Sequence, residues 1–303
     1  MYKRTYFNKD ALIVNKSEYN FGSLPIIDLF YGGGGNSPNY SRYLFQFDVE
    51  ALKLQNSRCE LGDLTLVKHY LNFKHAGFTE TSNACMPTNF TVCLVKVNEN
   101  WIEGCGNSEN CDASCTTFAQ LGCSVEKGPA NWYYAQNGVL WEGEGVFDSM
   151  SFEPEYLLCQ DVFCNNGNLK IDVTTIVNDL IVSNDPNYGF LLCFHYDLER
   201  ELSQVENHVV FFGRETSTFF EPYLETEYVN AIYDDRAKFY LDKTNRLYLY
   251  PTLDGEKINL DISPTVEIYN HLNQLQDTLI AACQDFGVYY IEYEIESAAI
   301  ERC

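Results

Sequence analysis

The stretch Ser41-Arg42-Tyr43-Leu44-Phe45-Gln46-Phe47-Asp48 decides the fold class of this chain. Aromatic side chains stand at alternate positions between Tyr43 and Phe47, and this period of two predicts a strand with one face buried. We expect Arg42 to reach a carboxylate or a carbonyl at the end of this strand. Asp48 and the residues that follow mark the point where the strand turns away. The stretch therefore predicts a core built from β-structure.

The composition extends this prediction to the whole chain. Of the 303 residues, 46% are hydrophobic and 15% are aromatic, with 22 Tyr and 20 Phe against 3 Met. Aromatic side chains suit the pleated, half-buried surface of a sheet, and a chain of this length can bury a large core without help from disulfides. We predict an all-β fold.

The pattern along the chain predicts two domains. Residues 1–228 carry strand candidates and are expected to form a jelly-roll-like β-sandwich, in which Phe190–His195 pairs with Val209–Phe212. Residues 229–303 are expected to form a small immunoglobulin-like β-sandwich, because short strands separated by turns recur there at regular spacing. The strands predicted in this second domain are Ala237–Leu241, Arg246–Tyr250, Thr265–Tyr269, Thr278–Ala282 and Val288–Ile295.

One short helix is predicted inside the larger domain. After Asp172 and Thr174, either of which can cap a helix, apolar residues recur at a spacing of three to four. The residues with this spacing are Ile176, Val177, Leu180 and Ile181.

The formal charge of −23 argues against some classes of partner. An acidic chain repels phosphate backbones, so nucleic acid is not expected to bind. The acidic surface serves either solubility alone or the recognition of a basic protein. No run approaches the roughly 18 apolar residues that a membrane helix needs, and no apolar segment follows the basic residues at the N-terminus. We expect a protein made in the cytosol that leaves it only by another route, such as lysis.

The twelve cysteines fall into two groups. Cys93 and Cys193 lie in apolar strand runs and are expected to be small buried hydrophobic side chains. The other group lies in a polar insertion near residues 105–130 and consists of Cys105, Cys111, Cys115 and Cys123. Their spacing is wider than the Cys-x2-Cys pair usual at zinc sites, so a zinc site, a disulfide and unlinked thiols stay open as alternatives.

Aromatic residues cluster around the same insertion. They are Trp101, Trp132, Tyr133, Tyr134 and Trp141. Such side chains form either a surface for a glycan or a protein partner, or plugs of the sandwich core.

Motifs for catalysis are missing from the sequence. The five histidines form no metal-binding pair, no Gly-x-Ser-x-Gly motif is present, and the run Gly32–Gly35 is not followed by the Lys of a phosphate-binding loop. Acidic pairs are expected by chance in a chain with 43 acidic residues, so a polysaccharide-degrading enzyme is only a third hypothesis. We therefore expect no enzyme, no cofactor and no bound metal.

A series of short phrases resembles the successive signatures of DNRLRE-type modules, which are jelly-roll-like β-sandwiches of bacterial surface proteins and phage structural proteins. In chain order they are Asp10-Ala-Leu-Ile, Asn20-Phe-Gly-Ser, Ser41 to Asp48, Trp101-Ile-Glu-Gly, Asn131-Trp132, Trp141, Ile171-Asp-Val-Thr174, Asn187-Tyr-Gly-Phe190 and Glu221-Pro-Tyr-Leu224. The resemblance implies a scaffold or binding protein without transferable catalytic residues.

The pairing of Trp101-Ile-Glu-Gly104 with Asn131-Trp132 and a later Glu-Gly-rich turn, followed by the short immunoglobulin-like tail, also resembles virion structural proteins of crAss-like gut bacteriophages. This second resemblance implies a component of the tail, neck ring or head–tail connector. Such a protein assembles in the host cytoplasm and contacts copies of itself in a ring and other virion proteins. The alternative is a carbohydrate-binding adhesion module that recognises a bacterial surface glycan.

Overall fold

The computed structural model confirms the prediction of an all-β, sandwich-type fold, with 44% of the described residues in strands and 13% in helices. It describes residues 1–33, 35–58, 60–61, 63–77, 84–85, 89–104, 106, 129–136, 138–147, 155–163, 168–183, 185–203, 205–228, 232 and 234–296. Within these residues no helix is long and apolar enough to cross a membrane.

The chain forms two compact units. The larger unit comprises Lys3–Val49 and His69–Thr226. The smaller unit comprises Met1–Tyr2, Glu50–Lys68 and Glu227–Cys303. Glu50–Lys68 therefore belongs to the same unit as the C-terminal residues, although the two segments are distant in sequence. The change of sequence pattern after residue 228, which predicted the domain boundary, gives no sign of this grouping.

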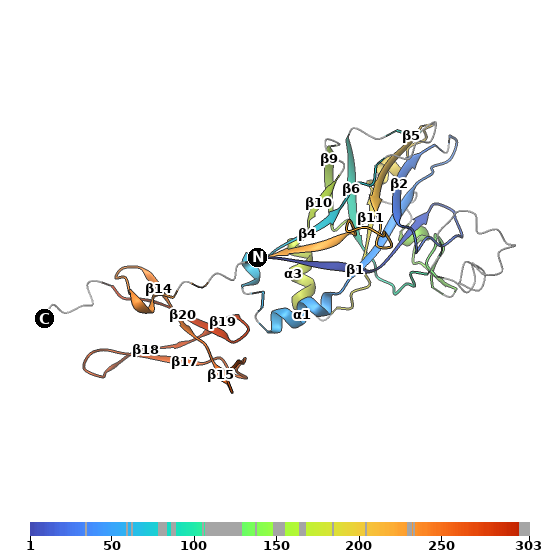
Figure 1. Cartoon of the computed structure of the whole chain (residues 1–303). Helices are drawn as coiled ribbons and strands as arrows, with labels where there is room; N and C mark the ends of the chain where they lie inside the picture. Colours follow the sequence, from blue (N-terminus) through green and yellow to red (C-terminus); the bar gives the residue numbers. More distant parts are fainter. Residues whose placement is uncertain are drawn as a thin grey trace. The chain divides into compact units, whose positions relative to one another are not determined.

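An eight-stranded sheet dominates the larger unit (Figure 1). In spatial order its strands are β10 (Leu169–Asp172), β4 (Lys68–Phe73), β13 (Tyr223–Glu227), β1 (Tyr2–Val14), β3 (Ser41–Phe47), β11 (Phe190–Phe194), β6 (Asn89–Lys96) and β9 (Leu158–Phe163). The strand β3 pairs antiparallel with β1 on one side and with β11 on the other. The stretch Ser41–Phe47 thus forms an interior strand of the largest sheet.

A second sheet contains β2 (Ile26–Gly32), β12 (Glu206–Phe212) and β5 (Ala84–Cys85). Rings from the two sheets touch: Tyr31 meets Phe194 with centroids 4.8 Å apart, and Phe211 meets Phe73 at 5.8 Å. The predicted pairing of residues 190–195 with residues 209–212 is wrong. The strand β12 instead pairs with β2 over seven residues, so β11 and β12 belong to different sheets.

The strand β3 also differs from its prediction, because both of its faces are buried. Phe45 stacks on Phe7 at 4.6 Å and meets Phe73 edge-on at 5.8 Å on the core face. The opposite face carries Arg42, which is 0% exposed. A strand of period two is expected to have one wet face, so other parts of the chain must cover the second face.

Three α-helices are described: α1 (Val49–Ser57), α3 (Thr174–Val182) and α4 (Tyr196–Glu199). The helix α3 is the one predicted, with Val177, Leu180 and Ile181 buried, and the Asp172 carboxylate accepts a hydrogen bond from the Thr174 N–H at 2.9 Å. The helix α1 follows β3 directly, where the sequence indicated only a change of direction. A 3-10 turn, η1 (Leu64–Leu66), lies between α1 and β4.

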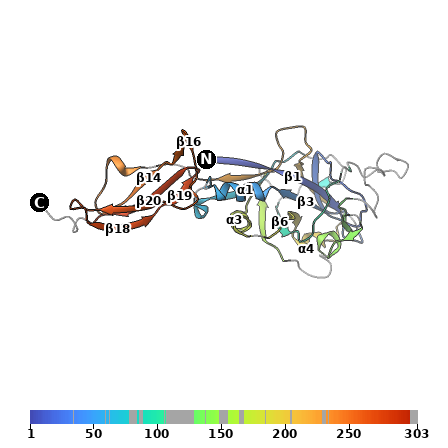
Figure 2. The same cartoon turned by 90° about the horizontal axis from the view of Figure 1, so that it is seen from below.

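The smaller unit is itself built from two layers (Figure 2). One layer is the sheet β14 (Thr244–Leu249), β20 (Val288–Glu294) and β19 (Ala282–Asp285), and the other is the ribbon β17 (Thr265–Tyr269) and β18 (Leu275–Ile280). A short hairpin, β15 (Thr252–Leu253) and β16 (Glu256–Lys257), completes its strands in the described residues. The predicted strand at 237–241 is absent, because a 3-10 turn, η3 (Asp235–Ala237), and irregular backbone occupy this stretch.

Side chains from both layers form the core of the smaller unit. The buried members are Ala281, Tyr289 and Ile291, and those packed against them are Leu247, Leu260, Val266, Ile268, Leu279 and Cys283.

Candidate functional site

A buried ion pair occupies the second face of β3. The Arg42 Nε and Nη2 donate to the two carboxylate oxygens of Glu199 at 2.9 and 2.7 Å, and both side chains are 0% exposed. Glu199 ends α4, which follows directly after β11. The expectation that Arg42 reaches a carboxylate or carbonyl is confirmed. Burial lowers the pKa of Arg42, but the charge and hydrogen bonds of Glu199 outweigh this and raise the pKa, so the guanidinium stays charged.

The same guanidinium anchors the segment that covers it. Arg42 Nη1 donates to the carbonyls of Gly145 at 2.5 Å and Phe147 at 2.8 Å, and the rings of Phe147 and Trp132 lie 3.7 and 4.9 Å from the guanidinium carbon. We call Arg42, Glu199, Gly145, Phe147 and Trp132 the Arg42 cluster. Its loop contains β7 (Tyr134–Gln136), β8 (Val139–Leu140) and the turn η2 (Glu144–Val146). The cluster explains why both faces of β3 are dry.

A second cluster surrounds Asp10 on β1, which is 2% exposed. The Tyr43 hydroxyl donates to Asp10 Oδ2 at 2.5 Å, and the Arg214 backbone N–H donates to the same oxygen at 3.0 Å. Glu103 Oε1 accepts from the Arg214 Nε at 3.1 Å and Nη2 at 2.7 Å, and from the Asp10 N–H at 2.7 Å. We call Asp10, Tyr43, Glu103 and Arg214 the Asp10 cluster. It joins β1, β3, the segment after β6 and the segment after β12.

The Asp10 carboxyl has an unusual pKa. Burial raises it from 3.8 to about 6, against the hydrogen bonds of Tyr43 and the Arg214 N–H, which lower it. A carboxyl of this kind is suited to proton transfer and is more frequent at functional sites than elsewhere. Here both donors to Asp10 Oδ2 come from the protein itself, and the Arg214 guanidinium lies 3.7 Å from Oδ1. The Asp10 carboxylate therefore links β1 to β3 and to the segment after β12.

The three predicted tryptophans are buried, with exposures of 2% for Trp101, 2% for Trp132 and 6% for Trp141. The indole of Trp101 donates to the Tyr188 carbonyl at 2.7 Å, and Lys9 Nζ lies 4.2 Å above its ring. The indole of Trp141 donates to the Asn131 carbonyl at 2.8 Å. These rings are therefore plugs of the core, and the alternative that placed them on a glycan-stacking surface is wrong.

The two tyrosines of that predicted surface, Tyr133 and Tyr134, are half-buried. Their backbone N–H groups both donate to the Asn131 side-chain oxygen, at 2.8 and 3.0 Å, so they form part of a tight turn beside Trp132. Of the five aromatic residues predicted as a surface, only Tyr133 and Tyr134 are thus partly accessible to solvent.

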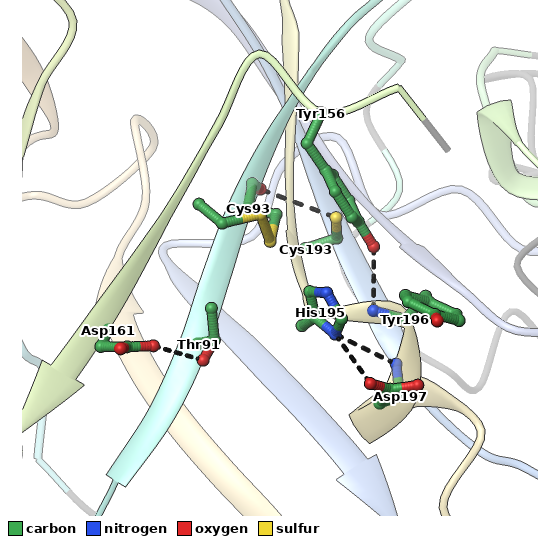
Figure 3. The surroundings of a disulfide bond; sticks show 9 residues. Thr91, Cys93, Tyr156, Asp161, Cys193, His195, Tyr196 and Asp197 are labelled. Atoms are coloured by element: carbon green, nitrogen blue, oxygen red, sulfur yellow. Dashed lines mark hydrogen bonds and ion pairs between the residues drawn. A yellow bond between two sulfur atoms is a disulfide. The ribbon is translucent and has the colours of Figure 1, made fainter. Parts of the chain in front are cut away.

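The cysteines differ from their prediction in part. Cys93 is bonded to Cys159 of β9, and Cys193 is a buried free thiol beside them (Figure 3). Both Cys93 and Cys193 are buried, as expected, but Cys93 is not simply a small hydrophobic side chain, because the pairing of β6 with β9 places Cys159 directly opposite it. Cys283 is also disulfide-bonded.

The zinc candidates Cys105, Cys111, Cys115 and Cys123 lie outside the described residues. Within the described part of the chain, no group of three or more His, Cys, Asp or Glu side chains is arranged to hold a metal ion.

Of the residues that make these clusters, Arg42, Tyr43 and Trp132 were singled out from the sequence, but none of their hydrogen-bond partners was. Asp10 and Glu103 lie inside the phrases quoted for the resemblance, but nothing local marks them as partners. The sequence feature that could have pointed to the two clusters is a charged residue inside an apolar strand, as at Asp10 and Arg42. Their partners Arg214 and Glu199 lie 204 and 157 residues away.

Comparisons with known proteins add no relative: no family model matches the sequence, and no curated protein matches it.

Proposed function

We propose that this chain is a non-enzymatic structural component of a bacteriophage virion, from the tail, neck ring or head–tail connector, and that it assembles through contacts with copies of itself and with other virion proteins. The resemblance of its sequence to such proteins motivates the proposal. The Arg42 and Asp10 clusters support it, because their charged groups bind one another and hold loops onto strands. Both clusters therefore serve to stabilise the fold, as expected for a structural protein.

The observation that carries the proposal lies on the ribbon β17–β18. On the outer side of the ribbon Thr265 is opposite Ile280, Glu267 is opposite Thr278, and Tyr269 is opposite Leu275, whereas the inner pair of Val266 and Leu279 packs toward the core. Ile280 is 74% exposed, and Tyr269 and Leu275 are each 52% exposed. We call Tyr269, Leu275 and Ile280 the outer ribbon face.

The outer ribbon face has the character of a contact surface. Large exposed apolar side chains on a strand pair favour association, and here they lie at the two ends of the ribbon, on either side of Glu267 and Thr278. Each ribbon strand pairs with only one neighbour among the described strands. An open strand edge offers unpaired backbone groups to a second chain. A protein that forms rings needs such surfaces on each subunit.

A glycan-binding function has less support. The tryptophans that the sequence offered for stacking on sugars are buried, and only Tyr133 and Tyr134 keep partial access.

The proposal is tested by sedimentation velocity and negative-stain electron microscopy of the purified chain. We expect concentration-dependent oligomers, and ring-shaped particles in the images. Ile280→Lys and Leu275→Lys should shift the protein toward monomer, whereas Thr252→Lys, which adds the same charge at an exposed position of β15, should not. A monomer at all concentrations, together with absence of the chain from purified phage particles, would overturn the proposal.

A further inference from the structure

Three cysteines lie side by side across three neighbouring strands. In the antiparallel pairing of β11 with β6, Cys193 is opposite Cys93, and in the pairing of β6 with β9, Cys93 is opposite Cys159. Directly opposite residues of antiparallel strands project their side chains on the same face of the sheet. The three sulfurs therefore form a row with Cys93 in the middle, and we call these residues the cysteine row.

The two ends of the row lie in different environments. Cys193 is 0% exposed, as is Cys93, whereas Cys159 is exposed on β9, the last strand in the order of this sheet. The Cys93–Cys159 disulfide therefore ties an outer strand to the sheet. The side-chain hydrogen bond from Thr91 to Asp161, at 2.6 Å, joins the same two strands beside it.

Either neighbour of Cys93 is within reach of a disulfide. Opposite residues of antiparallel strands have Cα atoms about 4.5 or 5.5 Å apart, and disulfides bridge Cα separations of about 4.4–6.8 Å. The bonded Cys93 and Cys159 have Cα atoms 4.1 Å apart, just below this range. On the other side, the Cys193 thiol already contacts Cys93, since its sulfur lies 3.6 Å from the Cys93 carbonyl oxygen (Figure 3).

We propose that the cysteine row is a thiol–disulfide exchange site that releases a surface thiol at Cys159. The Cys193 thiolate attacks the Cys93 sulfur, a Cys93–Cys193 bond forms, and the Cys93–Cys159 bond breaks. The sulfur of Cys159 leaves as a thiolate and takes up the proton that Cys193 has lost. One disulfide and one thiol are present before and after, so the step consumes no oxidant or reductant.

The exchange moves the reactive thiol from the interior to the edge of the sheet. In the structure the free thiol of Cys193 is buried and closed to other molecules. After exchange the free thiol is that of Cys159, which can attack a disulfide of another protein or a low-molecular-weight disulfide, forming a mixed disulfide and releasing the other sulfur as a thiol. The row thus provides a latent site for a covalent cross-link, and this inference does not depend on the proposed virion role.

The surroundings of Cys193 keep the resting form inert. Burial raises the pKa of this thiol well above its usual range, Glu199 raises it further, and Arg42 lowers it only in part. Burial raises the pKa of the neighbouring Tyr156 phenol, and Cys193 raises it further. Because only the thiolate attacks a disulfide, exchange should be slow at neutral pH and should accelerate about tenfold for each unit of added pH.

The experiment maps disulfides in the oxidised full-length chain. Protein is incubated at pH 7 and at pH 9, free thiols are trapped with N-ethylmaleimide, and peptides are identified by mass spectrometry without reduction. We expect peptides linked through Cys93–Cys193, with maleimide on Cys159, to accumulate about 100-fold faster at pH 9. In Cys193→Ser and Cys193→Ala, both checked for folding by near-ultraviolet circular dichroism, Cys159 should stay unlabelled.

A second variant tests the geometry separately. In Cys159→Ser, oxidised glutathione should produce the Cys93–Cys193 disulfide, because the remaining two members of the row are opposite each other. The proposal is overturned if Cys159 is labelled at the same rate in the Cys193 variants, if Cys93 becomes linked to a cysteine outside the row, or if folded Cys159→Ser forms no Cys93–Cys193 bond.

Discussion

At the scale of single residues, Arg42 shows how a charge can be placed in the interior of a sheet. Its guanidinium donates to both oxygens of Glu199 and to two backbone carbonyls, so the cost of removing the charge from water is offset by four hydrogen bonds. Such a pair stabilises the fold only while both partners are present.

The first prediction concerns this pair. Glu199→Gln should lower the free energy of unfolding by about 3–5 kcal/mol, because it leaves a buried guanidinium without its counter-charge. Urea denaturation followed by tryptophan fluorescence measures the change. Glu50→Gln is the matched control, since it breaks the exposed pair with Lys53 and should cost less than about 1 kcal/mol. Equal effects of the two variants would contradict a structural role for the Arg42 cluster.

The second prediction concerns two buried groups that titrate in opposite senses. Burial raises the pKa of Asp10 from 3.8 to about 6 and lowers the pKa of His69 from 6.5 to about 4. Between pH 4 and pH 6 folded Asp10 binds the proton that unfolded Asp10 has lost, so its contribution to stability falls as pH rises. Folded His69 lacks the proton that unfolded His69 holds, so its contribution falls as pH drops. The two contributions largely cancel in the native chain.

Variants should separate these contributions. The stability difference between native protein and Asp10→Asn should shrink by about 3 kcal/mol from pH 4 to pH 6, whereas the difference between native protein and His69→Gln should grow by a similar amount. Urea denaturation at intervals across this range gives both curves. Flat differences for both variants would show that neither group titrates as described.

At the scale of elements, the sequence predicted what depends on local period. The alternation from Tyr43 to Phe47 predicted a strand, and the spacing from Ile176 to Ile181 predicted α3, because strand and helix periods repeat within a few residues. The pairing of β12 with β2, the burial of the second face of β3 and the bond from Cys93 to Cys159 were not predicted. Each of these features joins segments that are far apart in the chain. The local pattern of one segment does not show which distant segment it will contact, so they could not be predicted from it.

The third prediction tests how the loop at η2 is seated on the sheet. Gly145 has φ +67°, and a Cβ there would lie 2.5 Å from the Trp132 ring. Gly145→Ala should therefore cost backbone strain of about 1–2 kcal/mol and a further 1–3 kcal/mol for the displaced indole. Gly77→Ala is the control, because Gly77 has φ +96° with nothing within 4 Å of the added atom.

Thermal and urea denaturation of both variants separate strain from contact. Gly77→Ala should show the strain alone. If Gly145→Ala is no less stable than Gly77→Ala, the loop does not need the close approach between Gly145 and Trp132.

At the scale of the whole molecule, the net charge of −23 acts on every association. Two copies of the chain repel each other, whereas a basic protein is attracted. Added salt screens both effects, since the Debye length falls from about 10 Å at 0.1 M to about 3 Å at 1 M. The direction of the salt dependence therefore distinguishes self-association from recognition of a basic partner.

The fourth prediction follows for self-association through the outer ribbon face. In the proposed assembly, contact between the exposed apolar side chains of Ile280 and Leu275 favours association and like charge opposes it, so dimers and larger species should increase as sodium chloride is raised from 0.05 to about 0.5 M. Sedimentation equilibrium measures the dissociation constant at each concentration. Ile280→Lys should weaken association at every salt concentration, whereas Thr252→Lys, with an identical change of charge, should leave it unchanged or strengthen it slightly. Association that weakens with salt, or equal loss in the two variants, would mean that charge rather than this apolar face governs the assembly.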